Sequence, residues 1–288
     1  MADVIVVADS CHYIQPELVE SYGIQQVSLH VLLPDGTERR ESDYAGDYGA
    51  YYDILTTSAK LPTTSQPSIQ DFLEVWTPIL DAGNEVLSMN ISADLSGTFE
   101  TATAARDTLG DRASKVALVN TRSCAGGEAL VVLAGAAAVR AGMSLEAAAA
   151  HSNAAREQMK IWFAVDTLEY MEKGGRIGAA SAWIGAALKI KPILTFEEQV
   201  EPVERVRTSK RALARMGEYL QMLKDNGADT WLVQHIQDPE RADQLIARGT
   251  EIFGYGPTIA SEVGPVVGTY IGPGLLGVGG MPTSFMNP

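Results

Sequence analysis

The stretch NEVLSMNISADLSGTFETATAARDTL, residues 84–109, predicts a buried strand followed by a helix. Its first part, residues 84–91, is a short apolar run, and a helical pattern begins at residue 97. The same alternation surrounds this stretch, with strands expected at 3–10, 25–33 and 115–120 and helices expected at 17–22, 69–81 and 126–141. Strands that alternate with helices favour a mostly parallel sheet covered on both faces. Residues 1–155 are therefore predicted to form a three-layer α/β/α domain.

The pattern changes after a polar helix that we expect at 145–160. Two expected strands, 190–196 and 200–207, are separated by the three residues EEQ and predict an antiparallel hairpin. Strands are also expected at 161–166, 230–236 and 258–263, and helices at 178–188, 208–224 and 238–252. Residues 156–288 are therefore predicted to form a two-layer α+β domain with a mixed sheet.

Length, composition and cysteine content limit the class of protein. The chain has 288 residues, 46% of them hydrophobic, and no apolar run approaches the ~20 residues of a membrane span. The N-terminus MADVIVVADS lacks the basic region of a secretory signal. The two cysteines, Cys11 and Cys124, are too few for a disulfide framework or a structural zinc site. We therefore expect a cytoplasmic protein with free buried thiols and no bound metal.

The charge distribution argues against a nucleic-acid partner. The net charge is −14 at neutral pH, whereas binding to a phosphate backbone needs clustered cations. Residues 173–215 differ from the rest, because they contain nine Lys or Arg and only four Asp or Glu. This basic segment suits a single anionic group or an acidic partner protein.

Hydroxyl side chains gather where ligands bind in open parallel sheets, beyond the carboxyl ends of the strands. Ser92 and Ser96 follow one expected strand, and the three hydroxyl residues 63–65 (TTS) directly precede the expected helix 69–81. A single hydroxyl can cap a helix, but each of these places offers more than one. A second hydroxyl beside free helix N–H groups can hold a small anion. The pattern favours a carboxylate site in which one hydroxyl of 63–65 caps the helix and another holds the ligand.

Nucleotide-binding motifs give no support for phosphoryl transfer by this chain. The phosphate-binding pattern G-x-x-x-x-G-K-[ST] does not occur. The pattern G-x-G-x-x-G does occur, at Gly272, Gly274 and Gly277, but it lies near the C-terminus instead of between a first strand and its helix. We therefore expect no dinucleotide and no other cofactor.

An ordered set of short segments resembles a known family. The segments are VVADS (6–10), TSQPS (64–68), ISADLSGT (91–98), LEYMEKGGRIG (168–178), LKIKPIL (188–194) and RVRTSKRAL (205–213). Together they resemble the DegV family, the fatty-acid-binding proteins that serve bacterial fatty acid kinase. The resemblance spans essentially the full chain. It implies a two-domain fold with a long-chain fatty acid buried in a tunnel between the domains.

The resemblance also implies roles for particular residues. The fatty acid carboxylate is expected at Thr64 and Ser96, with Ser65, Ser92 and Tyr270 nearby. Arg176 and Arg207 are expected to contact the head group or the kinase. Glycines are expected to shape the surrounding loops, namely Gly97, Gly174, Gly175, Gly272 and Gly274. A separate kinase subunit would phosphorylate the bound acid for phospholipid synthesis, so this chain itself is predicted not to be an enzyme.

The sequence departs from the family pattern at two positions. Tyr270 stands where family members usually have His, and Ala93 follows Ser92 where members often have a pair of serines. A phenol can hydrogen-bond a carboxylate, but it does not become cationic near neutral pH. The Tyr270 exchange therefore bears on recognition of a doubly charged acyl phosphate, or on its transfer to the kinase.

Two other functions remain open from the sequence. One is an enzyme for a small hydroxylated or keto substrate, built on the related dihydroxyacetone-kinase-like fold. The other is a carrier for a different carboxylate lipid. The residues that surround an acyl tail are not identified by any motif, and we expect them in 41–58 and 178–188.

Overall fold

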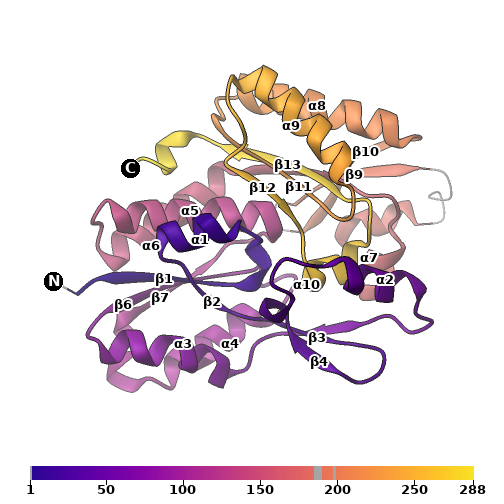
Figure 1. The fold of residues 1–288 in the computed structure, drawn as a ribbon. Coiled ribbons are helices and arrows are strands. Elements are labelled where there is room, and N and C mark those ends of the chain that lie inside the picture. Colours follow the sequence, from indigo (N-terminus) through magenta and orange to yellow (C-terminus); the bar gives the residue numbers. More distant parts are fainter. Residues whose placement is uncertain (1, 185–189, 197–198) are drawn as a thin grey trace.

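A computed structural model describes residues 2–184, 190–196 and 199–288 (Figure 1). The N-terminal sheet has four parallel strands in the order β2-β1-β6-β7. These strands are β1 (Val4–Asp9), β2 (Gln25–Val27), β6 (Glu85–Asn90) and β7 (Val116–Asn120). The inner strands β1 and β6 are mostly buried, as expected for apolar runs in a sheet with two covered faces.

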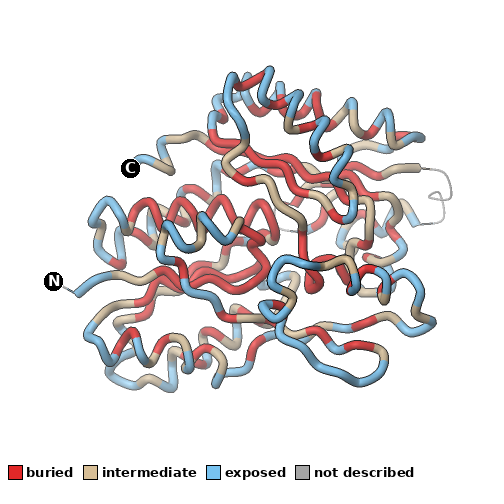
Figure 2. The backbone as a smooth tube through the Cα atoms, viewed as in Figure 1, coloured by how far each residue is buried: buried red, intermediate tan, exposed pale blue. Residues whose placement is uncertain are grey.

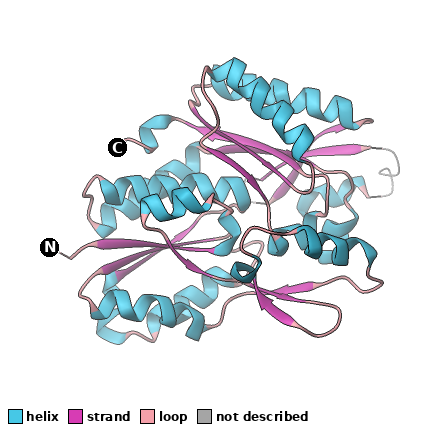
Figure 3. Ribbon diagram, viewed as in Figure 1, coloured by secondary structure: helices cyan, strands magenta, loops and turns pink. Residues whose placement is uncertain are grey.

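Helices cover both faces of this sheet (Figures 1 and 3). One face is covered by α3 (Ile69–Asp81) and α4 (Thr98–Asp107), the other by α1 (Pro16–Tyr22), α5 (Ala125–Arg140) and α6 (Leu145–Gln158). Helix α3 buries Phe72, Trp76 and Leu80 at helical spacing against the sheet. The three-layer α/β/α prediction is therefore confirmed.

The Ala-rich helix α5 is the centre of the molecule. It is buried from Ala125 to Ala138, and Figure 2 shows it in red between the two halves. One side of α5 packs on the N-terminal sheet, and another side packs on strands of the C-terminal sheet. A helix that is apolar all round is expected in such a fully covered place.

The C-terminal sheet is mixed, with the strand order β10-β9-β8-β13-β11-β12. Its strands are β8 (Lys160–Ala164), β9 (Lys191–Phe196), β10 (Val200–Val206), β11 (Thr230–His235), β12 (Ile259–Glu262) and β13 (Leu276–Met281). Strands β11 and β12 are parallel, and the other pairs are antiparallel, including the predicted hairpin β9–β10. Helices α8 (Ser209–Asp225) and α9 (Pro239–Phe253) cover the outer face, which confirms the two-layer prediction.

Smaller elements join the two halves at one end of the molecule. A three-stranded antiparallel sheet consists of β3 (His30–Leu32), β4 (Glu38–Arg40) and β5 (Thr63–Ser65). Helix α10 (Pro265–Ile271) packs against this sheet and against α2 (Gly49–Thr57) and α7 (Glu169–Gly174). This packing brings the TTS segment of the N-terminal half beside the C-terminal half.

Several expected boundaries differ from the structure. The expected strand 25–33 is divided into β2 and β3, because the chain leaves one sheet and joins another. The expected helix 178–188 is a 3₁₀ turn at Gly178–Trp183, and residues 185–189 lie outside the described residues. The division at 155/156 falls inside α6.

The sequence did not predict α10 or β13. Helix α10 has only seven residues. Strand β13 contains Gly277, Gly279 and Gly280, and glycine normally weakens a strand. At Gly279 and Gly280 an added Cβ would lie 2.9 and 2.7 Å from backbone oxygens of the neighbouring strands. Close packing explains these two glycines.

Candidate functional site

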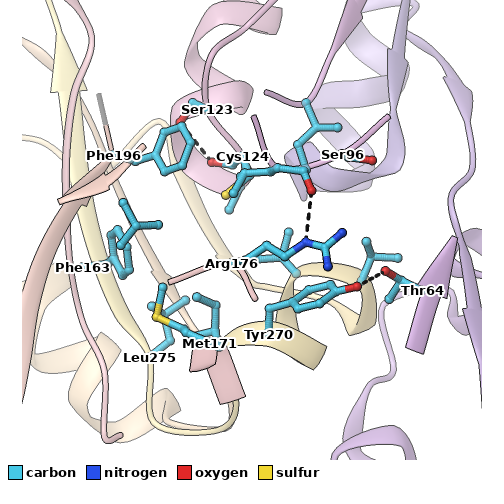
Figure 4. A pocket seen from close by; sticks show the side chains of 18 of the residues that line it. Thr64, Ser96, Ser123, Cys124, Phe163, Met171, Arg176, Phe196, Tyr270 and Leu275 are labelled. Atoms are coloured by element: carbon cyan, nitrogen blue, oxygen red, sulfur yellow. Dashed lines mark hydrogen bonds between the residues drawn. The ribbon is translucent and has the colours of Figure 1, made fainter. Parts of the chain in front are cut away.

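A pocket of about 120 Å³ lies where α5, α10 and the C-terminal sheet meet. One part of its lining is polar, with Thr64, Ser96, Arg176 and Tyr270 (Figure 4). The remainder is mainly apolar and includes Ile161, Phe163, Met171, Phe196, Val200 and Leu275. The lining residues come from both halves of the chain, so the pocket depends on how the halves pack together.

A hydrogen bond joins the two halves at the polar part. The Thr64 Oγ1 atom on β5 lies 2.7 Å from the Tyr270 hydroxyl on α10. Ser96 lies just before α4, where its Oγ is 2.8 Å from Thr98 Oγ1 and accepts a hydrogen bond from the Thr98 N–H. The Thr64–Tyr270 bond uses one of the two O–H donors of that pair and leaves the other for an anion.

Arg176 supplies positive charge at the same place. Its Cζ lies 4.8 Å from the centre of the Tyr270 ring, and its guanidinium donates to the carbonyl oxygens of Leu95 and Gly174. No carboxylate of the described residues forms an ion pair with Arg176. An Arg without an acidic partner beside several hydroxyls is suited to a carboxylate or phosphate.

The KGGR segment explains how Arg176 and Tyr270 come together. Gly175 ends α7 with φ +72°, a conformation that favours glycine. Gly174 is the last helical residue, and a Cβ there would lie 2.2 Å from Tyr270 Cδ1. Gly174 therefore allows the Tyr270 ring to approach the backbone, whereas Gly175 turns the chain toward Arg176.

Other residues of the expected site lie elsewhere. Ser65 is exposed and does not line the pocket, because alternate residues of a strand point to opposite sides. Ser92 is fully buried, and its Oγ accepts a hydrogen bond from the Asp94 N–H in its own turn. Arg207 is exposed between β10 and α8, outside the pocket lining. Among the expected glycines Gly97 lines the pocket, and Gly272 and Gly274 have positive φ angles.

Two expectations from the sequence are wrong. No hydroxyl of residues 63–65 caps α3, because Ser68 does so, with Asp71 bonding back to the Ser68 N–H. Residues 41–58 do not surround the pocket, and neither does the described part of 178–188. Both stretches pack outside it, in α2 and in the turn against β10.

The apolar lining could have been found in part from strand periodicity. Ile161 and Phe163 alternate on β8 and therefore share one face of the sheet. Gly277 pairs with Phe163 on one side and with Gln234 on the other, and all three line the pocket. The sequence does not reveal which face of the strand is turned to the pocket, since both faces are buried.

A buried carboxyl lies behind α10. Glu41 accepts hydrogen bonds from Ser10 Oγ (2.6 Å), the Tyr13 hydroxyl (2.7 Å) and the Val266 N–H (2.8 Å). Burial raises the pKa of Glu41 from 4.5 to about 7, although these hydrogen bonds act in the opposite direction. Glu41 thus fixes the first turn of the helix that carries Tyr270.

Metal and membrane features are absent from the part of the chain that the structure describes. Within residues 2–184, 190–196 and 199–288, no three His, Cys, Asp or Glu side chains come together as a metal site. None of the helices in these ranges combines the length and the apolar character that crossing a membrane requires.

Comparison with known proteins gives matches along the whole chain. The model of the DegV family matches residues 3–283. A DegV domain-containing protein from Clostridium perfringens is 34% identical over 277 residues, which cover 95% of this chain and 96% of the relative. The protein DegV from Bacillus subtilis is 31% identical over 279 residues, covering 96% and 98%.

Solved structures share the fold. The crystal structure of DegV from Bacillus subtilis, described as a fatty acid binding protein, has a TM-score of 0.85 at 29% identity and covers 98% of this chain and 100% of that one. A DegV family protein from Thermus thermophilus, described in terms of its fatty acid binding, has a TM-score of 0.83 at 28% identity and covers 97% and 99%. Sequence motifs, fold and these matches agree, and the chain belongs to the DegV family.

Proposed function

We propose that this protein binds a long-chain fatty acid in the pocket between its two halves. The observation that carries the proposal is the pocket's division into a polar part, with Arg176 and hydroxyls, and an apolar part around Phe163 and Phe196. A fatty acid has the same division, and burial of its tail contributes ~0.8 kcal/mol per CH₂. Relatives from Bacillus subtilis and Thermus thermophilus that bind fatty acids support the same function.

The carboxylate is assigned to Thr64, Ser96 and Tyr270, with Arg176 as counter-ion. Thr64 and Tyr270 already face each other at 2.7 Å, so a carboxylate that displaces their hydrogen bond can accept from both hydroxyls. Ser65 and Ser92 are left out of this set, because neither lines the pocket. The site lies between the proposed domains 1–155 and 156–288.

Acyl-chain binding requires the lining side chains to move. The cavity of about 120 Å³ is smaller than the ~150 Å³ of a cavity that holds one benzene molecule. A long acyl chain is much larger than benzene. Met171 is suited to such movement, because its thioether side chain is flexible.

The second part of the proposal is presentation of the acid to a separate fatty acid kinase in the cytoplasm. The bound carboxylate would lie beside exposed Arg176, and exposed Arg207 offers a further cation to the kinase or the acyl phosphate. The chain lacks the phosphate-binding pattern that a phosphoryl-transfer enzyme of the P-loop type uses. We therefore propose that this chain is the binding subunit and that the kinase carries out phosphoryl transfer.

Solvent extraction of the purified protein, followed by mass spectrometry, tests the first part directly. A near-stoichiometric fatty acid supports the proposal. An empty extract, with no rise in melting temperature on adding palmitate or oleate, contradicts it. A series of acids from eight to eighteen carbons adds a second criterion. A tunnel predicts that affinity rises steeply with chain length, whereas a small-substrate site predicts that affinity does not depend on chain length.

A further inference from the structure

The pocket contains a second group of polar atoms, at the N-terminus of the 16-residue helix α5. Ser123, Cys124 and Ala125 line the pocket there, and Gln234 faces them from β11. No side chain caps α5, and within the described residues the N–H groups of Ala125 and Gly126 donate no hydrogen bond. These are two of the free donors that every helix start leaves.

Gln234 provides an acceptor at the same place. It is 2% exposed, and its Nε2 donates to Ser261 Oγ (3.0 Å) and, more weakly, to the Tyr13 carbonyl oxygen (3.5 Å). Ser261 Oγ itself donates to that carbonyl. If the Gln234 carboxamide were flipped, Oε1 would face the Tyr13 carbonyl oxygen, and two acceptors would lie together. These contacts therefore fix the positions of Oε1 and Nε2.

The fixed oxygen is directed at the start of α5. Gln234 Oε1 lies 3.0 Å from the point that a Cβ on Gly126 would occupy. It accepts no hydrogen bond from any residue in the described ranges. A carboxamide oxygen that accepts no hydrogen bond from the protein is left to pair with a ligand or a water molecule in the pocket. The oxygen and the free helix N–H groups therefore form one polar site open to the pocket, apart from the polar part at Thr64, Ser96, Arg176 and Tyr270.

We propose that this site is a second polar subsite and that the preferred ligand is a hydroxy fatty acid, with its chain hydroxyl bound between Gln234 Oε1 and the N-terminus of α5. The inference rests on the proposed fatty acid function. A hydroxyl donates one hydrogen bond and accepts others, so it satisfies both sides of the site. A ketone can only accept a hydrogen bond, and a double bond can neither donate nor accept one. A saturated chain leaves both Gln234 Oε1 and the helix N–H groups without partners.

Binding constants for stearic acid and a series of monohydroxystearic acids test the proposal. One positional isomer is expected to bind about tenfold more tightly than stearic acid, which corresponds to two hydrogen bonds of ordinary net strength. The methyl ether of that isomer retains an acceptor but has no donor for Gln234, so it is expected to lose the advantage. The ether needs no protein variant, so this result is independent of whether any variant folds.

Variants locate the effect. Gln234→Met has a similar shape but no acceptor, and it is expected to bring the ratio of the two binding constants close to one. The matched control Gln221→Met, on the exposed face of α8, is expected to keep the wild-type ratio. Stearic acid binding as tightly as every hydroxy isomer would overturn the subsite and indicate a bound water instead. Failure of all the acids to bind would overturn the proposed function as well.

Discussion

The Thr64 and Tyr270 hydroxyl oxygens lie 2.7 Å apart, although 206 residues separate them in the chain. Their hydrogen bond joins β5 of the N-terminal half to α10 of the C-terminal half at the polar part of the pocket. The Tyr270 ring is held between Gly174 and the Arg176 guanidinium. A ligand carboxylate at this point would exchange one neutral hydrogen bond for two charged ones, which are stronger.

Removing the Thr64 hydroxyl tests this exchange. Thr64→Val keeps the shape of the side chain but cannot donate to a carboxylate. Fatty acid affinity is expected to fall about tenfold, since a hydrogen bond to a charged group contributes ~1.5 kcal/mol or more. Thr63→Val is the matched control, because Thr63 is an exposed residue of the same strand outside the pocket. Isothermal titration with palmitate measures both, and equal losses in the two variants would contradict the assignment.

Arg176 is expected to act as the counter-ion of the carboxylate. Arg176→Met retains the long side chain but removes the charge, and affinity for palmitate should fall about fivefold, the upper range for a solvent-exposed ion pair. The dependence of affinity on salt between 50 and 500 mM should also become weaker. Arg211→Met, an exposed arginine on α8, is the control. An unchanged salt dependence in Arg176→Met would show that the carboxylate lies elsewhere.

The strands and helices were easier to predict from the sequence than the set of residues that meet at the site. The strands and helices of the N-terminal half follow from apolar runs, and the hydroxyl at position 64 was expected near a ligand. The sequence did not identify Ser68 as the cap of α3, because the hydroxyls of residues 63–65 are equally suitable caps. Only the fold shows that residues 63–65 form β5. The sequence could not show whether the Ser65 and Ser92 side chains face the pocket, because the direction of a side chain depends on strand register and local turns.

The apolar lining was the least predictable part. Phe163, Phe196 and Leu275 lie in three separate segments that meet only through the strand order of the mixed sheet. Gln234 has no motif around it, and its unpartnered oxygen exists only because Ser261 and Tyr13 orient the amide. Such contacts between distant segments leave no local pattern in the sequence.

Gly277 is expected to limit the length of the bound acyl chain. An added Cβ there has no protein neighbour closer than 3.7 Å, and the φ angle is not positive. Because Gly277 lies between Phe163 and Gln234 in the pocket face of the sheet, a larger side chain would occupy space for the ligand. Gly277→Val should fold, lose affinity for stearate and retain affinity for decanoate.

Thermal unfolding and binding of both acids check the Gly277 prediction. Gly256→Val is the control, since Gly256 is exposed and a Cβ there meets nothing within 4 Å. Parallel losses for stearate and decanoate in Gly277→Val would indicate general damage to the sheet. A selective loss for the longer acid would place Gly277 beside the tail.

Glu41 is expected to make stability depend on pH near neutrality. Its pKa is raised from 4.5 in the unfolded chain to about 7 in the fold. Between these values the folded protein holds a proton that the unfolded chain releases, so stability falls as pH rises and becomes constant above about pH 7. The full effect is roughly 3 kcal/mol at ~1.4 kcal/mol per pKa unit, an upper bound for a carboxyl with three hydrogen bonds.

Comparison with Glu41→Gln isolates this contribution, because other buried groups also make stability depend on pH. Burial lowers the pKa of His12 to about 3, so His12 adds stability as pH rises from about 3 to its ordinary value of 6.5. Burial also raises the pKa of Asp9 and Glu128 and lowers that of His235, so the wild-type profile is the sum of several groups. These groups are common to both proteins, so the free energy of unfolding in urea of Glu41→Gln minus that of the wild type should rise with pH between about 4.5 and 7 and then become constant. A wild type and variant with parallel pH profiles would mean that Glu41 is ionised throughout, despite its burial against α10.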